Sequence, residues 1–335
     1  MSKLLAVRVV AAPDKFRGTA GASDIARAIA AAAEAAGWAC DEVPLADGGE
    51  GTLEVLGGAN RSTLVTGPLG DPVRAGWQLN GRRAVIEMAL ASGLELVGGP
   101  DGNDPMAATT YGTGELIAAA LDAGVRRIIV GVGGSATTDG GLGALRAVYP
   151  LQRLRGVELE VACDVRTTFV DAADVFASQK GASAAQMALL RRRLERLAQV
   201  YLDDYGVDVR ALERSGAAGG LAGALATAGA SLLDGFDLVA DEVDLDSALE
   251  GADLIVTGEG FVDAQSFEGK VVGGVSERAA AAGVPVLVVA GEVYDEAGRR
   301  VDAVSLVERF GEERARRDPC ACVEEVVRER LEKLA

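Results

Sequence analysis

The 335-residue sequence predicts an α/β fold with a mostly parallel sheet, and three observations support this prediction. Short apolar segments alternate with Ala- and Gly-rich segments of helical length along most of the chain. Hydrophobic residues make up 49% of the sequence, which supplies enough apolar surface for a core. Several apolar segments end in polar, Gly-rich turns, as the strands of open parallel sheets do. Since a typical domain has about 150 residues, this length predicts two domains.

Each expected strand is a short apolar run bounded by turn residues. The run that ends at Ala12 passes directly into Pro13-Asp14-Lys15, which favours a buried first strand over a signal peptide. Three runs between Ser62 and Met88 are separated by turn signals such as Asn80-Gly81, which indicates an antiparallel hairpin or meander. The expected strands cover residues 5–12, 42–46, 62–66, 73–79, 84–88, 127–132, 158–162, 254–256, 284–289 and 305–307.

Each expected helix is an Ala-rich or charged segment with a start or stop signal. Ser23 is a candidate N-cap for the first helix, and Gly37 is its candidate stop. The stretch 215–229 is so rich in Gly and Ala that it must pack closely or lie against a ligand. Helices are expected over residues 24–36, 114–123, 186–204 and 274–282, directly after Thr52 and Gly141, and after Asp318-Pro319 at the C-terminus.

Charge and composition exclude several classes of protein. The formal net charge of −17 argues against a nucleic-acid-binding surface, which needs a basic face. Aromatic residues, at 4%, leave few platforms for stacked bases. Apolar runs such as 284–290 are far shorter than the roughly 18 residues of a membrane helix. We therefore expect a cytoplasmic protein that binds neither nucleic acid nor membrane.

The sequence contains no histidine, so any proton transfer falls to Asp, Glu, Lys, Tyr or Cys. Catalysis by Ser-His-Asp or Cys-His groups is excluded. Four cysteines in a chain of this length do not form a disulfide framework. Cys320 and Cys322 form a C-x-C pair, but no second pair has the spacing of zinc ligands.

Lysine is rare in this sequence, since only five of the 33 basic residues are lysines. Lys15, Lys180 and Lys270 all lie in Gly-containing segments that resemble loops. A lysine ammonium is a compact point charge that suits phosphate or carboxylate oxygens. These three lysines and Arg17 are candidates for binding an anionic ligand, although lysines also fall near glycines by chance.

Five expected strands end in polar turns, and ligands of open parallel sheets bind beyond the carboxyl ends of the strands. We expect all five turns to meet in one crevice. The turns are Pro13-Asp14-Lys15, Ala46-Asp47-Gly48-Gly49, Gly133-Gly134-Ser135, Cys163-Asp164 and Gly258-Glu259-Gly260.

The turn that begins at Gly133 offers backbone N–H groups and hydroxyls at an expected helix start, which suits phosphate oxygens. It matches neither a P-loop nor the dinucleotide fingerprint, and a tight strand-to-helix connection would also need small residues. Phosphoryl transfer further needs carboxylates, one for Mg²⁺ and one to accept a hydroxyl proton. Each carboxylate at these turns is also a common turn former on its own. The carboxylates that follow the expected strand ends are Asp14, Asp47, Glu50, Asp139, Asp164, Glu259 and Asp263.

Ordered motifs run along nearly the whole chain, from Ala12-Pro13-Asp14-Lys15-Phe16-Arg17-Gly18-Thr19 through Gly131-Val132-Gly133-Gly134-Ser135-Ala136-Thr137 to Thr257-Gly258-Glu259-Gly260. Together these motifs resemble those of the bacterial glycerate kinases of the glycerate 2-kinase type. The resemblance implies phosphorylation of D-glycerate to 2-phospho-D-glycerate with ATP and Mg²⁺. It also implies two α/β domains with the active site in the cleft between them. We expect a Rossmann-like domain over residues 1–62 and 251–335, and an inserted domain over 63–250.

The chain is a short-loop variant within this resemblance. The segment between Gly143 and Glu158 is shorter than in most members, and the loop 166–178 lacks their usual Gly-Pro pattern. Phe261 stands where most members have Arg, and Thr138 where most have Asn. These departures bear on the acceptor substrate more than on the type of reaction.

Strand-end positions then suggest a role for each candidate residue. Asp47 and Asp164 are candidate proton acceptors, and Lys15 and Lys270 are candidate catalytic charges. The remaining candidates are Asp14, Arg17, Glu50, Lys180 and Asp263 for substrate, Gly133, Gly134, Ser135, Thr137 and Thr138 for ATP phosphates, and Asp139 and Glu259 for Mg²⁺.

Several alternatives stay open. The product could be the 3-phosphate, the acceptor could be another small hydroxy acid, or the protein could be a catalytically silent nucleotide-binding regulator. A dehydrogenase is disfavoured because no Gly-x-Gly-x-x-Gly follows the first strand. A homodimer is also left open.

Overall fold

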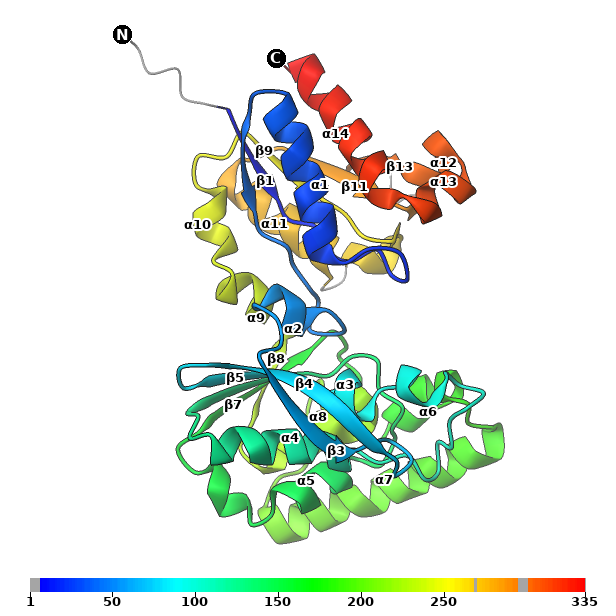
Figure 1. Cartoon of the computed structure of the whole chain (residues 1–335). Coiled ribbons are helices and arrows are strands. Elements are labelled where there is room, and N and C mark those ends of the chain that lie inside the picture. The colour runs from blue at the N-terminus through cyan, green and yellow to red at the C-terminus, as the bar shows by residue number, and fades with distance from the viewer. Residues whose placement is uncertain (1–6, 268–269, 295–300, 335) are drawn as a thin grey trace. The chain divides into compact units, whose positions relative to one another are not determined.

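The structure is a computed structural model that describes residues 7–267, 270–294 and 301–334. The chain divides into two compact units: unit 1 is Met1–Asp47 with Phe236–Ala335, and unit 2 is Gly48–Gly235 (Figure 1). Each unit is built on its own mostly parallel sheet with helices packed on it, so the predicted α/β class is confirmed.

The unit boundaries lie earlier in the chain than the expected ones at 62/63 and 250/251. Helix α2 (Thr52–Val55) belongs to unit 2 because the carboxylate of Glu87 accepts hydrogen bonds from the backbone N–H groups of Gly51 and Leu53, each at 3.1 Å. Beyond the second boundary, α9 (Gly235–Glu242, apart from its first residue) and α10 (Leu245–Leu249) belong to unit 1. Arg278 of unit 1 forms ion pairs with an aspartate on each of these two helices.

Unit 1 contains a five-stranded sheet in the order β13-β11-β9-β1-β2, and every neighbouring pair is parallel. A two-stranded parallel sheet pairs β10 with β12. The strands are β1 (Arg8–Ala11), β2 (Ala39–Glu42), β9 (Leu254–Thr257), β10 (Phe261–Val262), β11 (Val286–Ala290), β12 (Glu292–Val293) and β13 (Asp302–Ser305).

The central strands of unit 1 are apolar at nearly every position because helices cover both faces of the sheet. Val9, Val256 and Val289 pack in one core cluster with residues of α1 and α14 (Figure 1). Val288 packs on the opposite side against Val272 of α11. Besides α9 and α10, the helices of unit 1 are α1 (Ala22–Ala35), α11 (Val271–Ala282), α12 (Leu306–Phe310), α13 (Glu312–Arg317) and α14 (Pro319–Leu334).

Unit 2 contains a six-stranded sheet in the order β3-β4-β5-β6-β7-β8. The first three strands are antiparallel, as the turn signals predicted, and the pairs from β5 to β8 are parallel. The strands are β3 (Arg61–Thr66), β4 (Pro72–Asn80), β5 (Arg83–Glu87), β6 (Arg127–Gly131), β7 (Glu158–Cys163) and β8 (Ser231–Asp234).

The helices of unit 2 form two apolar clusters, one against the sheet and one under the long helix α7. Leu116 and Ile117 of α4 pack on the sheet with Ile128 of β6, whereas Leu190 and Leu194 of α7 pack with Phe169. Besides α2, the helices are α3 (Ala89–Ser92), α4 (Tyr111–Asp122), α5 (Leu142–Val148), α6 (Ala172–Phe176), α7 (Ala184–Tyr205) and α8 (Ala217–Thr227).

Two local expectations are wrong. The first helix begins at Ala22 after Gly21, so Ser23 lies inside the helix and is not its N-cap. The turn that starts at Gly133 is not a helix start, because α5 begins only at Leu142. The stretch 215–229 packs closely as predicted, but Ala218, Gly219 and Gly220 have positive φ angles that kink α8 near its start.

The five polar turns follow strands of two different sheets. The turns after β1, β2 and β9 belong to unit 1, whereas the turns after β6 and β7 belong to unit 2. Apolar runs and turns are local signals, and they do not indicate which strands pair. Among the described residues, no helix is long and apolar enough to cross a membrane.

Gly112 allows α4 to approach the sheet, because a Cβ at this position would lie 2.0 Å from the carbonyl oxygen of Thr66. We expect Gly112→Ala to lower the free energy of unfolding by about 2 kcal/mol or more, through overpacking. The control is Gly124→Ala, just beyond the end of the same helix, where a Cβ would meet nothing within 4 Å. Its φ of +79° predicts a loss of about 1 kcal/mol. Urea unfolding of both variants measures the difference, and equal losses would contradict the close approach.

Candidate active site

Three polar turns lie side by side at the carboxyl end of the unit 1 sheet. The chain beyond β1 stays paired with its neighbours, since the Asp14 amide donates to the Gly258 carbonyl at 2.8 Å and Leu45 donates to the Pro13 carbonyl at 2.9 Å. This pairing extends the strand order β9-β1-β2 past the strands themselves. It holds the turns that carry Glu259, Asp14 and Asp47 next to one another.

Lys15 lies between two of these carboxylates. Its Nζ atom is 3.9 Å from Oδ1 of Asp14 and 3.9 Å from Oδ1 of Asp47. The backbone N–H of Lys15 also donates to Oδ1 of Asp14 at 2.6 Å. The ammonium group is therefore shared by two acidic side chains.

Asp14 is buried, and burial raises the pKa of its carboxyl to about 7. The negative charge of Asp47 acts in the same direction, and the positive charge of Lys15 opposes both. A carboxyl that titrates near pH 7 is suited to accept a proton from a substrate hydroxyl.

Glu259 is the third carboxylate at this edge and is only 8% exposed. Burial raises the pKa of Glu259 to about 7, although the hydroxyl of Ser266 and the charge of Lys270 act against this shift. Its Oε1 atom has no hydrogen-bond partner among the described residues. A buried carboxylate oxygen without a partner is costly unless a ligand or a cation satisfies it.

The remaining candidates of unit 1 have different surroundings. Oδ1 of Asp263 accepts a hydrogen bond from the Ser266 amide at 3.1 Å, so this aspartate stabilises the short helical turn at Ala264–Phe267. Lys270 lies at the start of α11, and its Nζ is 5.9 Å from the centre of the Phe261 ring. Arg17 is exposed.

In unit 2, the loop after β6 packs against the segment that follows the unit boundary. A Cβ at Gly133 would lie 2.5 Å from Cα of Gly49. At Gly134, where φ is +67°, a Cβ would lie 2.2 Å from Oε1 of Glu50. Both positions therefore require glycine. The structure therefore places Glu50 against this loop.

Two buried side chains hold this loop in place. The Nζ of Lys180 donates to Oγ of Ser135 at 2.7 Å and to the carbonyl oxygen of Thr137 at 2.6 Å. Asn103 donates from Nδ2 to the carbonyl oxygens of Ala136 and Lys180. Burial lowers the pKa of Lys180 to about 7. Lys180 thus supports the loop from within, and a nearby anion would favour its charged form.

The loop carries hydroxyl groups to which no described residue forms a hydrogen bond. Thr137 and Thr138 are buried, and neither Oγ1 has a hydrogen-bond partner in the described part of the chain. Asn103 also has a buried Oδ1 without a partner among those residues. Sequence reasoning found the two threonines but missed Asn103, which lies about 30 residues earlier in an unremarkable turn.

Asp139 was assigned to Mg²⁺ from its position, but the structure gives its carboxylate another task. Oδ2 accepts from the amide and the hydroxyl of Thr110, both at 2.9 Å, and from the amide of Gly143 at 3.2 Å. Oδ1 accepts from the amide of Gly141 at 3.0 Å. These donors make Asp139 an anchor between the loop and α5.

Asp164 follows β7 and lies near a basic residue that the sequence analysis did not single out. Arg214 donates to the carbonyl oxygen of Cys163 at 3.2 Å and forms an ion pair with Asp234 at 3.0 Å. Arg214 has a φ of +71°, which is uncommon for a residue other than glycine. No sequence signal reports this angle. The proton-acceptor candidates Asp47 and Asp164 therefore lie in different units.

Within the described ranges, no group of three or more acidic or Cys side chains is placed to hold a metal ion. Magnesium at nucleotide sites usually keeps several waters and takes only one or two carboxylates beside the phosphates. Glu259, with its unpartnered Oε1, fits such a role.

Comparison with known proteins gives consistent matches over the whole chain. The profile of the Glycerate kinase family matches residues 9–149 and 150–329. Glycerate kinase of Bacillus subtilis (strain 168) is 40% identical over 327 residues, covering 86% of this chain and 85% of that protein. Glycerate 2-kinase of Escherichia coli (strain K12) is 38% identical over 332 residues, with 87% of each chain covered. The crystal structure of a protein described as glycerate kinase 2 from Salmonella typhimurium LT2 superimposes with a TM-score of 0.82 at 36% identity, covering 98% of both chains.

The buried Glu259 makes stability depend on pH in a direction that follows from its raised pKa. Because the folded-state pKa is about 7 and the ordinary value is 4.5, the folded protein binds the proton more tightly than the unfolded chain. This contribution, about 3 kcal/mol, is fully present below about pH 4.5 and is lost as the pH rises through 7. We expect Glu259→Gln to reduce the fall in Tm between pH 5 and pH 8.

Scanning calorimetry at several pH values measures this effect, with Glu34→Gln as the control at an exposed position on α1. The fall is reduced and not abolished in Glu259→Gln, because the raised pKa of Asp14 acts in the same direction. Parallel curves for the wild type and Glu259→Gln would show that the carboxyl titrates as an ordinary one.

Proposed function

Because this chain belongs to the glycerate kinase family, we propose that it transfers the terminal phosphoryl group of ATP to the 2-hydroxyl of D-glycerate. The family and the kinase class agree with the prediction from the sequence motifs. The names of the relatives support the acceptor, and the name of the Escherichia coli relative supports phosphorylation at the 2-position. The observation on this chain that carries the proposal is the Lys15 ammonium between the carboxylates of Asp14 and Asp47.

The proton of the attacking hydroxyl passes to the Asp14–Asp47 pair. The raised pKa of Asp14 makes this pair a better acceptor near neutral pH than an exposed carboxylate. Asp164, the other candidate, lies in unit 2 beside the Arg214–Asp234 ion pair, and we do not assign the proton to it. Lys15 and Lys270 supply positive charge for the substrate carboxylate and for the phosphoryl group in transfer.

Unit 2 contributes the loop over residues 133–138, which binds the phosphates of the nucleotide. Its hydroxyls at Thr137 and Thr138 lack partners in the described residues, and Lys180 and Asn103 hold it in shape from behind. Lys180 therefore acts on the phosphates by positioning the loop. A preformed loop binds without the cost of being ordered first.

Glu259 is the residue of this chain that would hold Mg²⁺, through the oxygen that has no protein partner. When bound, the ion neutralises charge that develops on the phosphate oxygens. The charge of Lys270 opposes the raised pKa of Glu259, and a bound cation would favour the charged form of this carboxylate further.

One observation favours a second acceptor. Phe261 and Tyr294 are both nearly half exposed, their ring centres are 6.3 Å apart, and Lys270 lies over the Phe261 ring. An aromatic pair beside a lysine suits a hydroxy acid with a larger apolar group than glycerate carries. A panel of such acids in the same assay compares the two acceptors.

The first test is the identity of the product. Purified protein with Mg-ATP and D-glycerate should release ADP, and enolase added without a mutase should convert the product to phosphoenolpyruvate. ADP release without phosphoenolpyruvate would point to the 3-phosphate. No glycerate-dependent ADP release would overturn the proposed acceptor and leave the hydroxy-acid panel or a silent regulator.

The second test is the pH dependence of the reaction. Because the Asp14–Asp47 pair must be deprotonated to accept a proton, kcat/KM should rise as the pH increases through about 7. Asp14→Asn and Asp47→Asn should each lower kcat by about 100-fold or more. Asp41→Asn on β2, which removes an ion pair with Arg8, is the matched control and should stay within about threefold of wild type. If both Asp14→Asn and Asp47→Asn keep near-native turnover, the assigned acceptor is wrong.

A further inference from the structure

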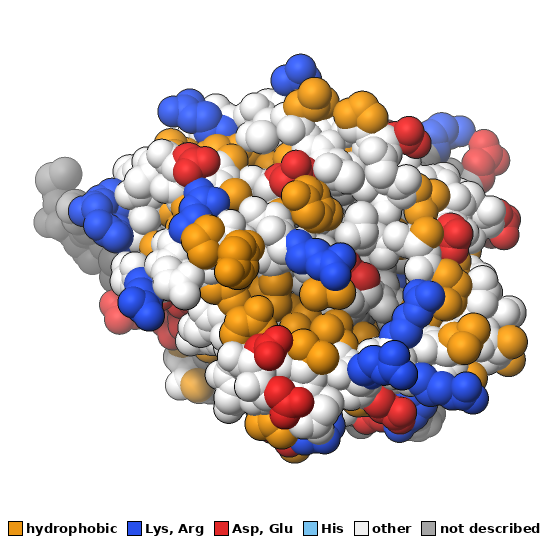
Figure 2. All heavy atoms as spheres, turned by 90° about the horizontal axis from the view of Figure 1, so that it is seen from below, with side chains coloured by type: hydrophobic (Ala, Val, Ile, Leu, Met, Phe, Trp, Pro, Cys, Tyr) orange, Lys and Arg blue, Asp and Glu red, His pale blue; other side chains and the backbone are white. Residues whose placement is uncertain are grey.

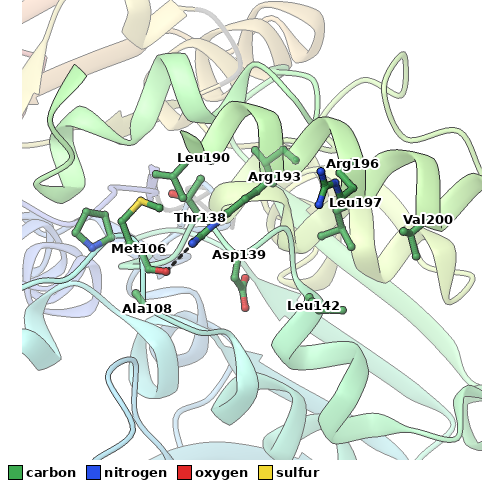
Figure 3. Close-up of a pocket in the computed structure, with 12 residues that line it drawn as sticks. Met106, Ala108, Thr138, Asp139, Leu142, Leu190, Arg193, Arg196, Leu197 and Val200 are labelled. Atoms are coloured by element: carbon green, nitrogen blue, oxygen red, sulfur yellow. Dashed lines mark hydrogen bonds between the residues drawn. The ribbon is translucent and has the colours of Figure 1, made fainter. Parts of the chain in front are cut away.

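Unit 2 contains a cavity of about 320 Å³, and of its lining residues only Thr138 has a part in the proposed function. One wall is the face of α7 that carries Leu190, Leu194 and Leu197, and the opposite wall comes from the segment 105–108 and the start of α5 (Figure 3). The lining residues are Pro105, Met106, Ala108, Thr138, Asp139, Leu142, Leu190, Arg193, Leu194, Arg196, Leu197 and Val200.

The cavity is apolar inside and open to solvent. Figure 2 shows hydrophobic side chains gathered in a hollow on the face that carries α5 and α7, with Lys and Arg side chains around it. Val200 is 40% exposed at the edge of the cavity, whereas Leu190 and Leu194 are fully buried in its wall. Pockets of roughly 300 to 1,000 Å³ with apolar walls and a few polar groups are typical small-molecule sites. A volume at the lower end of that range suits a flat, bicyclic ring better than a larger ligand.

One polar group in the wall is unsatisfied. Thr138 is 1% exposed, and its Oγ1 has no hydrogen-bond partner in the part of the chain that the structure describes. Figure 3 shows it between Leu190 and Asp139. A buried hydroxyl without a partner is costly, and it can both donate to a ring nitrogen and accept from an exocyclic amine.

The edge of the cavity is basic in a protein whose net charge is −17. Arg193 donates to the carbonyl oxygen of Met106 at 2.9 Å, as the dashed line in Figure 3 shows, so its guanidinium is fixed at the cavity. Within the described ranges, neither Arg193 nor Arg196 forms an ion pair with an acidic side chain. Met106 adds a thioether, which makes favourable contacts with aromatic rings.

The position of Thr138 connects this cavity to the phosphate loop, because Thr138 is the last residue of that loop. We infer that the cavity binds the purine base of the nucleotide substrate, so that base and phosphates lie on either side of Thr138. This inference rests on the proposed function, because it takes ATP as the phosphoryl donor. Thr138 and Met106 then contact the ring, and Arg193 and Arg196 lie at the edge of the cavity that holds it.

Two substitutions test this inference without changing any residue of the phosphate loop. Val200→Trp places a ring in the cavity from its exposed edge, and Met106→Ala removes a side chain from the opposite wall. The matched control is Leu189→Trp, because Leu189 lies on the same helix, is 47% exposed, and does not line the cavity.

The probes are AMP-PNP, which carries the base, and inorganic triphosphate, which lacks it, both titrated with Mg²⁺ by calorimetry. We expect Val200→Trp to raise the Kd for AMP-PNP about 10-fold or more, and Met106→Ala to raise this Kd as well. The Kd for triphosphate should stay within twofold of wild type in both variants, and Leu189→Trp should change neither value.

Two results would overturn the inference. An unchanged Kd for AMP-PNP in both variants would show that the base lies elsewhere, and equal losses for AMP-PNP and triphosphate would place the effect on the phosphates or on the fold. Wild-type protein that does not bind AMP-PNP also contradicts it. If AMP-PNP binds but D-glycerate gives no ADP release, the proposed acceptor is wrong. The Kd values of the two variants for AMP-PNP then still decide whether the base binds in this cavity.

Discussion

The sharing of one lysine ammonium by neighbouring carboxylates is the constraint on which the unit 1 site depends. The hydrogen bonds between the segments beyond β1, β2 and β9 bring Asp14, Asp47 and Glu259 to one edge of the sheet, where Lys15 lies within 4 Å of Asp14 and Asp47. Burial of these acidic side chains raises the pKa values of Asp14 and Glu259 to about 7, and the negative charge of Asp47 adds to both shifts.

Much of the fold could be predicted from the sequence, because burial and turn chemistry are local properties. The periodicity of apolar residues and the positions of turn residues predict the first strand, the antiparallel segments of unit 2 and the long helix α7. The second strand was expected over 42–46, but it pairs over Ala39–Glu42, because strand bounds depend on the partner strand and not on apolar character alone. The last strand of unit 1 is likewise Asp302–Ser305, and the expected residues 306 and 307 begin a helix.

The residue types of the candidate site could be predicted from the sequence, but the roles of the individual residues could be predicted less well. The rarity of lysine drew attention to three positions, yet the structure gives Lys180 a buried supporting role that differs from the exposed charge expected of it. Asp139 belongs to a hydrogen-bond network with Thr110, which lies 29 residues away in the sequence. Asn103 and Arg214 were missed for the same reason: their importance comes from long-range contacts and from backbone angles, which no local pattern records.

The chain passes from unit 1 into unit 2 at Asp47–Gly48 and returns at Gly235–Phe236. Gly48 and Gly235 are neighbours in space, since a Cβ on the first would lie 2.9 Å from Cα of the second. The inserted unit therefore begins and ends at almost the same point, as domains inserted into other chains commonly do. A short turn could close unit 1 without residues 48–235. The two units can thus vary as separate modules, because a change of length within residues 48–235 does not alter the two ends of unit 1 that the inserted unit joins.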